Sequence, residues 1–173
     1  MCRILTLVIL LIVSFNSYAF RFSGGELTPP QGFEGPVTKD MGRGSQTIAF
    51  FKEQSEKFKT LLQITVFETG QELPEMSESE LKQGLSNYLL KFLSGVSRQR
   101  ANFIKSDVTF VDISGITASK VSWRGSAHGM ELEGVMYCYL SGSKIISMHT
   151  QDLASNNSIY IKQAVNSIES IKR

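Results

Sequence analysis

The pattern of apolar and polar positions predicts one long amphipathic helix in the middle of the chain. Ser77 and Glu80 have the spacing of a capping box, in which each side chain accepts a hydrogen bond from the other residue's backbone N–H. After this start, large apolar residues recur at helical spacing: Leu81, Leu85, Tyr88, Leu89, Phe92, Leu93 and Val96. Full burial of such a stripe contributes on the order of 10 kcal/mol of gross burial energy. The helix must therefore pack on a sheet or on another helix.

Runs rich in β-branched and aromatic residues predict strands on both sides of this helix. Two runs precede it, at 47–54 and 61–68, and the polar segment between them indicates an antiparallel hairpin. Four runs follow the helix, at 107–113, 116–123, 131–140 and 144–150. A second helical stripe closes the chain, with Asn157 as its cap, and consists of Ile161, Ala164, Val165, Ile168 and Ile171. The predicted fold class is α+β, with the element order ββαββββα.

The last two strands are predicted to pair around a loop at 141–143. If this loop has three residues, Leu140 lies opposite Lys144. The same register gives the pairs Cys138 with Ile146, Met136 with Met148, Tyr139 with Ile145, and Val135 with His149. Both faces of this hairpin are largely apolar, so we expect both sides of the sheet to be covered.

The beginning of the chain has the layout of a secretory signal peptide. Arg3 precedes an apolar run from Ile4 to Val13, and small and polar residues follow, which predicts cleavage after Ala19. The apolar run is shorter than the about 20 residues that a membrane-spanning helix needs. We therefore expect a protein of the bacterial periplasm, with no stable membrane insertion after cleavage. Residues 20–45 are rich in Gly and Pro and predict an extended N-terminal arm before a single domain at 46–173.

Charge and cysteine content exclude two classes of protein. The formal net charge is +2, and removing Arg3 with the signal peptide lowers it to +1, so the strong positive excess of a nucleic-acid-binding domain is missing and no nucleic-acid partner is expected. Cleavage also removes Cys2 and leaves Cys138 alone. A disulfide-stabilised domain is therefore excluded, and the fold must depend on core packing. Cys138, in an apolar strand, is interpreted as an inert core thiol.

The stretch SWRGSAHGME, residues 122–131, most resembles a catalytic site, because Trp, Arg, Ser, His and Glu lie close together in it around two glycines. It joins two predicted strands, whereas a nucleophile elbow joins a strand to a helix. We therefore interpret it as a hairpin turn. Trp and Arg are over-represented at binding hot spots. The predicted contacts to a partner are consequently Trp123, Arg124 and His128.

Other candidate groups give weaker signals. The only histidines, His128 and His149, lack a metal-binding spacing, so no metal, cofactor or catalytic residue is assigned. The predicted register brings three carboxylates, Glu131, Glu133 and Asp152, toward one end of the hairpin, where a pair could act as general acid and base. The run SRQRANFIK, residues 97–105, places three cationic side chains around Phe103. It either docks an anionic partner or is a solvated helix end followed by a loop.

The closing stretches GVMYCYLSGSKIISMHTQD and IYIKQAVNSIESIK, together with the element order, resemble the PsbP/Mog-type fold family over roughly residues 46–172. The resemblance implies an antiparallel sheet flanked by helices, an α/β/α sandwich. It also implies a role as a protein-binding or assembly accessory, because members include extrinsic photosystem subunits, a Ran-binding nuclear protein and bacterial envelope proteins. No shared catalytic residues map onto this chain.

The sequence thus predicts a periplasmic, non-enzymatic protein that acts by protein–protein recognition in the envelope. Two alternatives stay open. One is an immunity-type inhibitor of a periplasmic toxin. The other is a hydrolase that uses the carboxylates Glu131, Glu133 and Asp152.

Overall fold

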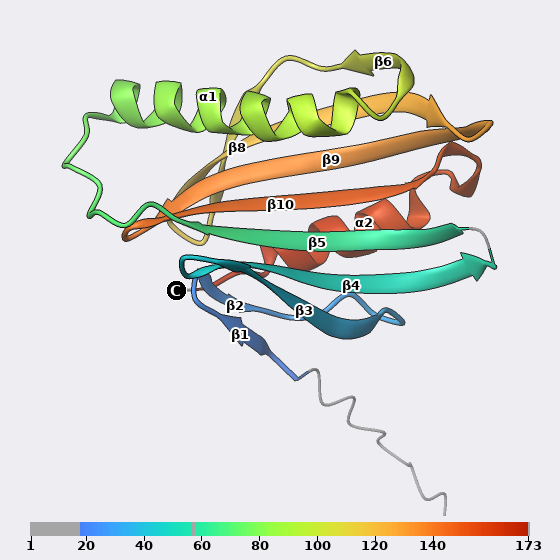
Figure 1. Ribbon diagram of the computed structural model, residues 1–173, viewed down its shortest axis with the longest axis horizontal. Coiled ribbons are helices and arrows are strands. Elements are labelled where there is room, and N and C mark those ends of the chain that lie inside the picture. Colours follow the sequence, from blue (N-terminus) through green and yellow to red (C-terminus); the bar gives the residue numbers. More distant parts are fainter. Residues whose placement is uncertain (1–17, 57, 173) are drawn as a thin grey trace, which may run out of the picture.

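The computed structural model describes residues 18–56 and 58–172, so the predicted signal peptide lies almost wholly outside the described residues. Figure 1 shows one large antiparallel sheet with a helix on each side. The strand order is β3-β4-β5-β10-β9-β8-β6, β7 also pairs with β8, and β1 pairs with β2 in a separate hairpin. None of the helices within the described ranges is both long and apolar enough to cross a membrane.

The strands are β1 (Phe20–Phe22), β2 (Gly25–Leu27), β3 (Glu34–Gly42), β4 (Ser45–Ser55), β5 (Phe58–Glu68), β6 (Ala101–Lys105), β7 (Thr109–Ile113), β8 (Ile116–Ala127), β9 (Met130–Ser141) and β10 (Lys144–Leu153). The helices are α1 (Glu78–Ser97), the short 3₁₀ turn η1 (Ala154–Asn156) and α2 (Ile159–Glu169). The α+β class is confirmed. The predicted order lacks the strands β1, β2, β3 and β6.

Helix α1 forms as its sequence predicts. The Ser77 side chain accepts a hydrogen bond from the Glu80 N–H, and the Glu80 carboxylate accepts one from the Ser77 N–H at 2.9 Å. Of its apolar stripe, Leu85, Leu89 and Leu93 are buried and pack on β8 and β9. The stripe therefore builds the core on one face of the sheet.

Helix α2 covers the opposite face and packs on β10, β5 and β9. Alternate residues of β9 separate the two cores: Met136 and Cys138 face α1, while Tyr137 and Tyr139 face α2. The predicted helical cap is wrong. Asn157 and Ser158 both adopt the left-handed conformation, and neither side chain caps the helix. Ser158 instead donates a hydrogen bond to Glu133.

The Gly/Pro-rich segment 20–45 is not an irregular arm. It forms the β1–β2 hairpin and the edge strand β3, which pairs with β4. Glu26 and Lys172 exchange two backbone hydrogen bonds of 2.9 Å, and Leu27 is fully buried in the α2-side core. Local hairpin turns at 23–24 and 43–44 thus form these strands, and the pairing of Glu26 with Lys172 and the burial of Leu27 attach the segment to the rest of the fold.

The hairpin of β9 and β10 is shifted by one residue from the predicted register. Lys144 lies opposite Ser141, because the turn contains only Gly142 and Ser143, and Gly142 has a φ of +58° that suits such a tight turn. Cys138 therefore faces Ser147, and His149 faces Met136. A shift of one residue exchanges the two faces of a strand, so His149 lies on the α1 side of the sheet.

Candidate functional site

On the α1 side, no helix of the described residues lies over β4 and β5. Helix α1 lies over β8 and β9, and Figure 1 shows no helix in front of β4 and β5 in the described chain. Ile48, Leu62 and Val66 point into the core beneath α2, so the residues that alternate with them point to the open side. We call this surface the uncovered face, and it consists of Ala49, Phe51, Leu61, Gln63, Thr65 and Phe67, together with Val37, which lies opposite Ala49.

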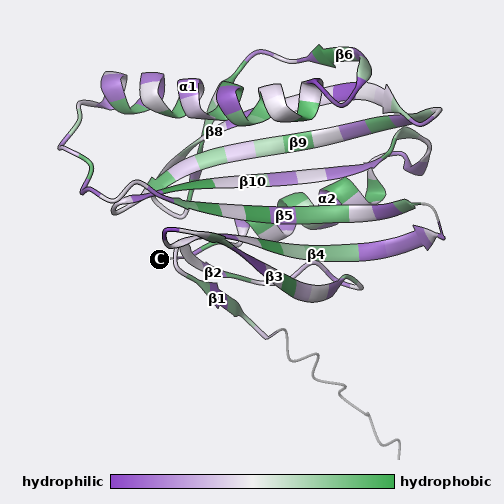
Figure 2. Cartoon of the chain, viewed as in Figure 1, coloured by the Kyte–Doolittle hydropathy of each residue, from purple (hydrophilic) through white to green (hydrophobic). Residues whose placement is uncertain are grey.

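The uncovered face presents large apolar side chains to solvent. Phe67 is 49% exposed, and Phe51 and Leu61, which pair across β4 and β5, are partly buried. On the edge strand β3, Val37 pairs with Ala49 and is 56% exposed. Figure 2 shows apolar colouring along much of β5. An apolar sheet face without a covering layer is typical of a surface that contacts another molecule.

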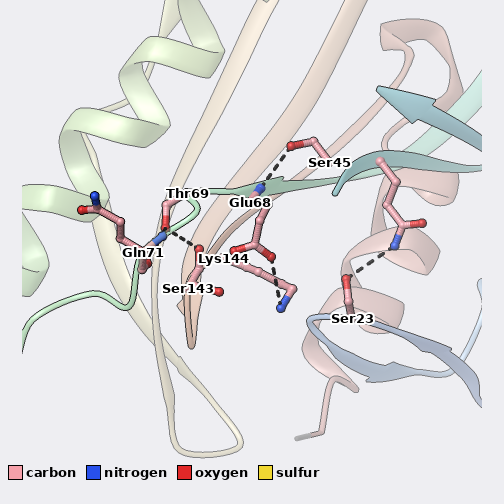
Figure 3. A network of polar contacts seen from close by, with 8 residues as sticks. Ser23, Ser45, Glu68, Thr69, Gln71, Ser143 and Lys144 are labelled. Carbon is pink, nitrogen blue, oxygen red and sulfur yellow. Dashed lines mark hydrogen bonds and ion pairs between the residues drawn. The ribbon is translucent and has the colours of Figure 1, made fainter. Parts of the chain in front are cut away.

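A network of polar contacts holds the end of β5 beside this face (Figure 3). The Glu68 carboxylate lies 3.4 Å from Lys144 Nζ, and the Glu68 N–H donates to Ser45 Oγ at 3.1 Å. Hydrogen bonding to the Ser143 hydroxyl, together with Lys144, holds the pKa of Glu68 below its usual range. The Thr69 hydroxyl donates to the Ser143 carbonyl at 2.7 Å. These contacts join β4, β5 and β10, so the network fixes the strand end that carries Phe67.

A cavity of about 350 Å³ lies where the uncovered face runs beneath the C-terminal end of α1. We call it the Arg100 pocket. Its apolar lining includes Leu61, Phe92 and Val96, and its polar lining includes Gln63, Thr65, Arg100, Ser147, His149 and Gln151. Residues 99–100 follow α1 directly, and the other polar groups come from β5 and β10. With Met136 of β9, the cavity is lined by α1 and the residues that follow it and by three strands, β5, β9 and β10.

Arg100 lies over the aromatic rings next to this pocket. Its guanidinium carbon is 5.5 Å from the centroid of the Trp123 ring, and the Phe103 ring stacks on Trp123 at 5.7 Å. Arg100 Nη2 donates to Gln151 Oε1 at 2.7 Å, and Nη1 donates to the Gln99 carbonyl at 3.2 Å. Within the described chain Arg100 forms no ion pair. In the described chain its positive charge therefore interacts only with an aromatic ring face and with uncharged oxygen atoms.

Three nitrogen atoms around the pocket are buried and have no hydrogen-bond partner in the described residues: Arg100 Nε, Trp123 Nε1 and His149 Nε2. A buried polar atom without a partner is costly and uncommon in folded proteins. Burial lowers the pKa of Arg100, and burial together with the Arg100 charge lowers the pKa of His149 to about 4. The imidazole is therefore neutral at pH 7.

The three contact residues predicted from the sequence do not share one surface. Trp123 is only 2% exposed and belongs to the core beneath α1, so its place as a surface contact is corrected here. Arg124 alternates with it and lies on the opposite face, where its side chain is 70% exposed and 3.5 Å from Glu133. His128 is exposed in the turn between β8 and β9, which has only two residues, since β8 runs to Ala127. The stretch does form a hairpin, but residues 124–127, expected in its connection, belong to β8 and pair with β9.

The predicted carboxylate cluster is only partly formed. Glu133 and Asp152 lie opposite each other on β9 and β10, whereas Glu131 is exposed. Asp152 accepts hydrogen bonds from Thr60 at 2.6 Å and from Asn156 at 2.9 Å. Glu133 is engaged by Ser158 and Arg124. Both carboxylates thus serve as local acceptors, and the described residues contain no group of three His, Cys, Asp or Glu side chains that could hold a metal ion.

The basic and aromatic character of the segment around Arg100 is visible in the sequence, but its position in the fold is not. The run 97–105 is compatible with either a docking site or a solvated loop, and it does not predict strand β6, in which Asn102 has a φ of +51° and the pairing with β8 is irregular. The shifted register also assigned His149 to the wrong face. The isolated basic and aromatic run was the one available signal for this site.

Solved structures show what this arrangement resembles. The structure of the cyanobacterial PsbP protein CyanoP from Synechocystis sp. PCC 6803 matches 90% of this chain and 91% of its own, with a TM-score of 0.60 and 11% identity. The chain has a PsbP-like fold. A protein of unknown function from Pseudomonas aeruginosa, PA94, matches 90% of this chain and 96% of its own, with a TM-score of 0.53 and 9% identity. At these identities the PsbP-like likeness concerns the fold alone.

The PsbP part of the expected resemblance is thereby supported, whereas neither of these structures bears on its Mog part. No family model and no curated protein sequence matches this chain.

Proposed function

We propose that this protein is a non-enzymatic binding or assembly accessory of the bacterial envelope, and that it recognises a protein partner through the uncovered face. One observation carries the proposal: among the described residues, a core-forming sheet leaves Phe51 and Phe67 without a covering layer on the α1 side. On the α2 side, the apolar residues of the same strands, β4 and β5, are buried in the core. Covering the open side with a partner removes apolar surface from water, which is the main favourable term in protein association.

The geometry also provides a means of selection among partners. The polar side chains Gln63 and Thr65 lie between Leu61 and Phe67 on β5, and Phe92 and Val96 of α1 line the same cavity as Leu61. A partner segment that lies along β5 would contact apolar side chains on two sides and polar side chains beneath. Apolar contacts supply affinity, and the polar groups favour a partner that can satisfy them.

Export to the periplasm is part of the proposal. Its support is the pattern of charged, apolar and small residues at positions 1–19. The chain that acts in the envelope would then begin at Phe20, which is the first residue of β1. Arg124 and His128 are retained as proposed additional contacts, because both are exposed, although neither belongs to the uncovered face.

The test compares matched variants in pull-downs from an envelope extract, with quantitative identification of the captured proteins. Phe67→Ser combined with Val37→Ser alters the uncovered face at two exposed positions. Ile159→Ser alters a 55% exposed apolar residue on α2, the helix that covers the other face, and Arg124→Ala combined with His128→Ala alters the contacts predicted from the sequence. We expect the first variant to lose the partner that the wild type and Ile159→Ser retain. Loss only in the Arg124 and His128 variant would contradict the assignment to the uncovered face.

A further inference from the structure

Arg100 carries a positive charge that no acidic side chain neutralises within the described chain. Its guanidinium is partly buried, and its contacts are the Trp123 ring and the oxygens of Gln99 and Gln151. Its Nε atom is buried without a hydrogen-bond partner. Buried charges in proteins are normally paired, because an unpaired one loses hydration without compensation. Because the described chain pairs this partly buried charge with no carboxylate, an anionic group from outside would supply a pairing that the chain lacks.

The pocket beside Arg100 has the chemistry of an anion site. Among the described residues that line it there is no Asp or Glu, while Gln63, Thr65 and Ser147 offer neutral donors. His149 Nε2 is buried and unpartnered at the same cavity. A negative group is attracted there, and a positive group is repelled. Because the guanidinium is a planar fork of N–H donors, it matches the two oxygens of a carboxylate.

We infer that the Arg100 pocket binds a carboxylate that is attached to an apolar group. The single cation matches one negative charge, since the neighbouring imidazole is neutral and adds no second positive charge that a phosphate dianion would need. Leu61, Phe92 and Val96 provide a wall for the apolar part. The volume of about 350 Å³ is near the lower end of the range for small-ligand sites, about 300 to 1,000 Å³, and suits a short chain.

The carboxylate has two possible sources, a free small acid or an acidic group of the partner protein. The second source rests on the proposed function, because the pocket opens beside the uncovered face and a partner bound there would place its carboxylate on Arg100. The first source does not depend on any partner. An experiment on the purified protein alone therefore separates failure of this inference from failure of the proposed function.

The probe is hexanoate, and the readout is the indole N–H resonance of Trp123 in the NMR spectrum. The chain has a single tryptophan, so this resonance is unique, and its ring contacts both Arg100 and His149. We expect hexanoate to shift the resonance saturably. The neutral analogue 1-hexanol, at equal concentration, should not. Inorganic phosphate should fail to displace hexanoate.

Variants assign the binding to Arg100. Arg100→Gln should weaken hexanoate binding at least tenfold, Arg100→Lys should weaken it less, and Arg98→Gln should leave it unchanged, because Arg98 is exposed two residues away.

A peptide that ends in a free leucine carboxylate should bind more tightly than its amide if the partner is the source, and equal weak binding of the two would assign the site to free acids. If Arg100→Gln unfolds, the comparison of hexanoate with 1-hexanol on the wild type decides. The inference would be overturned if hexanoate caused no shift or the same shift as 1-hexanol. It would also be overturned if phosphate displaced hexanoate, or if the Arg100→Gln and Arg98→Gln variants bound hexanoate equally.

Discussion

The Trp123 indole and the His149 imidazole lie with their ring centroids 5.6 Å apart and their planes inclined by 34°, although they belong to strands that are not neighbours. Strand β9 runs between β8 and β10, and Gly134 is the residue of β9 that pairs with Trp123. A Cβ atom at Gly134 would lie 2.5 Å from the Trp123 ring. The missing side chain thus lets the indole lie across β9 and reach His149.

Gly134→Ala should be strongly destabilising because the added methyl group meets both the indole ring and the Thr150 carbonyl oxygen at 2.5 Å. We expect a loss of about 3 kcal/mol in the free energy of unfolding, measured by urea denaturation. Gly84→Ala is the matched control: nothing lies within 4 Å of its added Cβ, and alanine in a helix gains about 1 kcal/mol. Similar stabilities for the two variants would contradict the packing of Trp123 over β9.

The stability of the protein should depend on pH through His149. Its pKa is lowered to about 4 in the folded state, mainly by burial and further by Arg100, whereas an unfolded histidine titrates near 6.5. Between these values the unfolded chain binds a proton that the folded chain does not, so stability falls as the pH decreases from about 6.5 to about 4. The loss should be about 3 kcal/mol at pH 4.

The measurement is urea unfolding of the wild type and of His149→Gln at several pH values. Groups that titrate in both proteins cancel in the difference, so the pH-dependent part of the difference reports His149. His128→Gln serves as a control, because His128 is exposed in a turn and should leave the pH dependence unchanged. Parallel pH profiles for the wild type and His149→Gln would show that the imidazole is not desolvated.

Cys138 should be inert in the folded protein. The side chain is fully buried on β9, and burial raises the pKa of its thiol to about 12, so almost no reactive thiolate exists at pH 8. Iodoacetamide, followed by peptide mapping, should modify Cys138 only in the presence of denaturing urea. Fast modification of Cys138 in native buffer would mean that β9 opens readily or that the thiol reaches solvent.

The capping box at the start of α1 should contribute measurably to stability. Ser77→Ala removes the side-chain acceptor for the Glu80 N–H and should lower the free energy of unfolding by about 1 kcal/mol. Ser79→Ala makes the same chemical change at an exposed position in the first turn of the helix, and it should change stability by less than about 0.5 kcal/mol. An equal effect of both substitutions would show that the box contributes nothing beyond helix propensity.

The parts of the fold that the sequence predicts are those decided locally. Ser77, Glu80 and the apolar stripe specify α1 within a few turns, and the structure confirms each of them. The β9–β10 hairpin is predicted as an element but not in register, because the length of its turn depends on the conformation of Gly142. The strands β1 to β3 lie in short local hairpins, β1 with β2 and β3 with β4, which the Gly- and Pro-rich composition of this segment does not reveal. Their place in the fold depends in addition on distant pairing, such as Glu26 with Lys172.

The candidate site also depends on contacts between residues that are distant in the sequence, so the sequence alone does not predict it. Arg100, Trp123 and His149 come together only because Gly134 leaves a gap in β9 and because the register places His149 on the α1 side. The uncovered face is a property of helix placement: α1 lies over β8 and β9 and leaves β4 and β5 open. The position of α1 over the sheet is set by tertiary packing, and the apolar stripe alone does not specify which strands it covers.

The most direct test of the central claim is photo-crosslinking in intact cells, with a crosslinking amino acid in place of Phe67 or, in a separate strain, of Ile159. The two positions have similar exposures, 49% and 55%, but lie on the uncovered face and on α2 respectively. The proposed function predicts a discrete crosslinked product from position 67 that is absent from position 159. A product from position 159 alone would place the partner on the other side of the sheet and contradict the account.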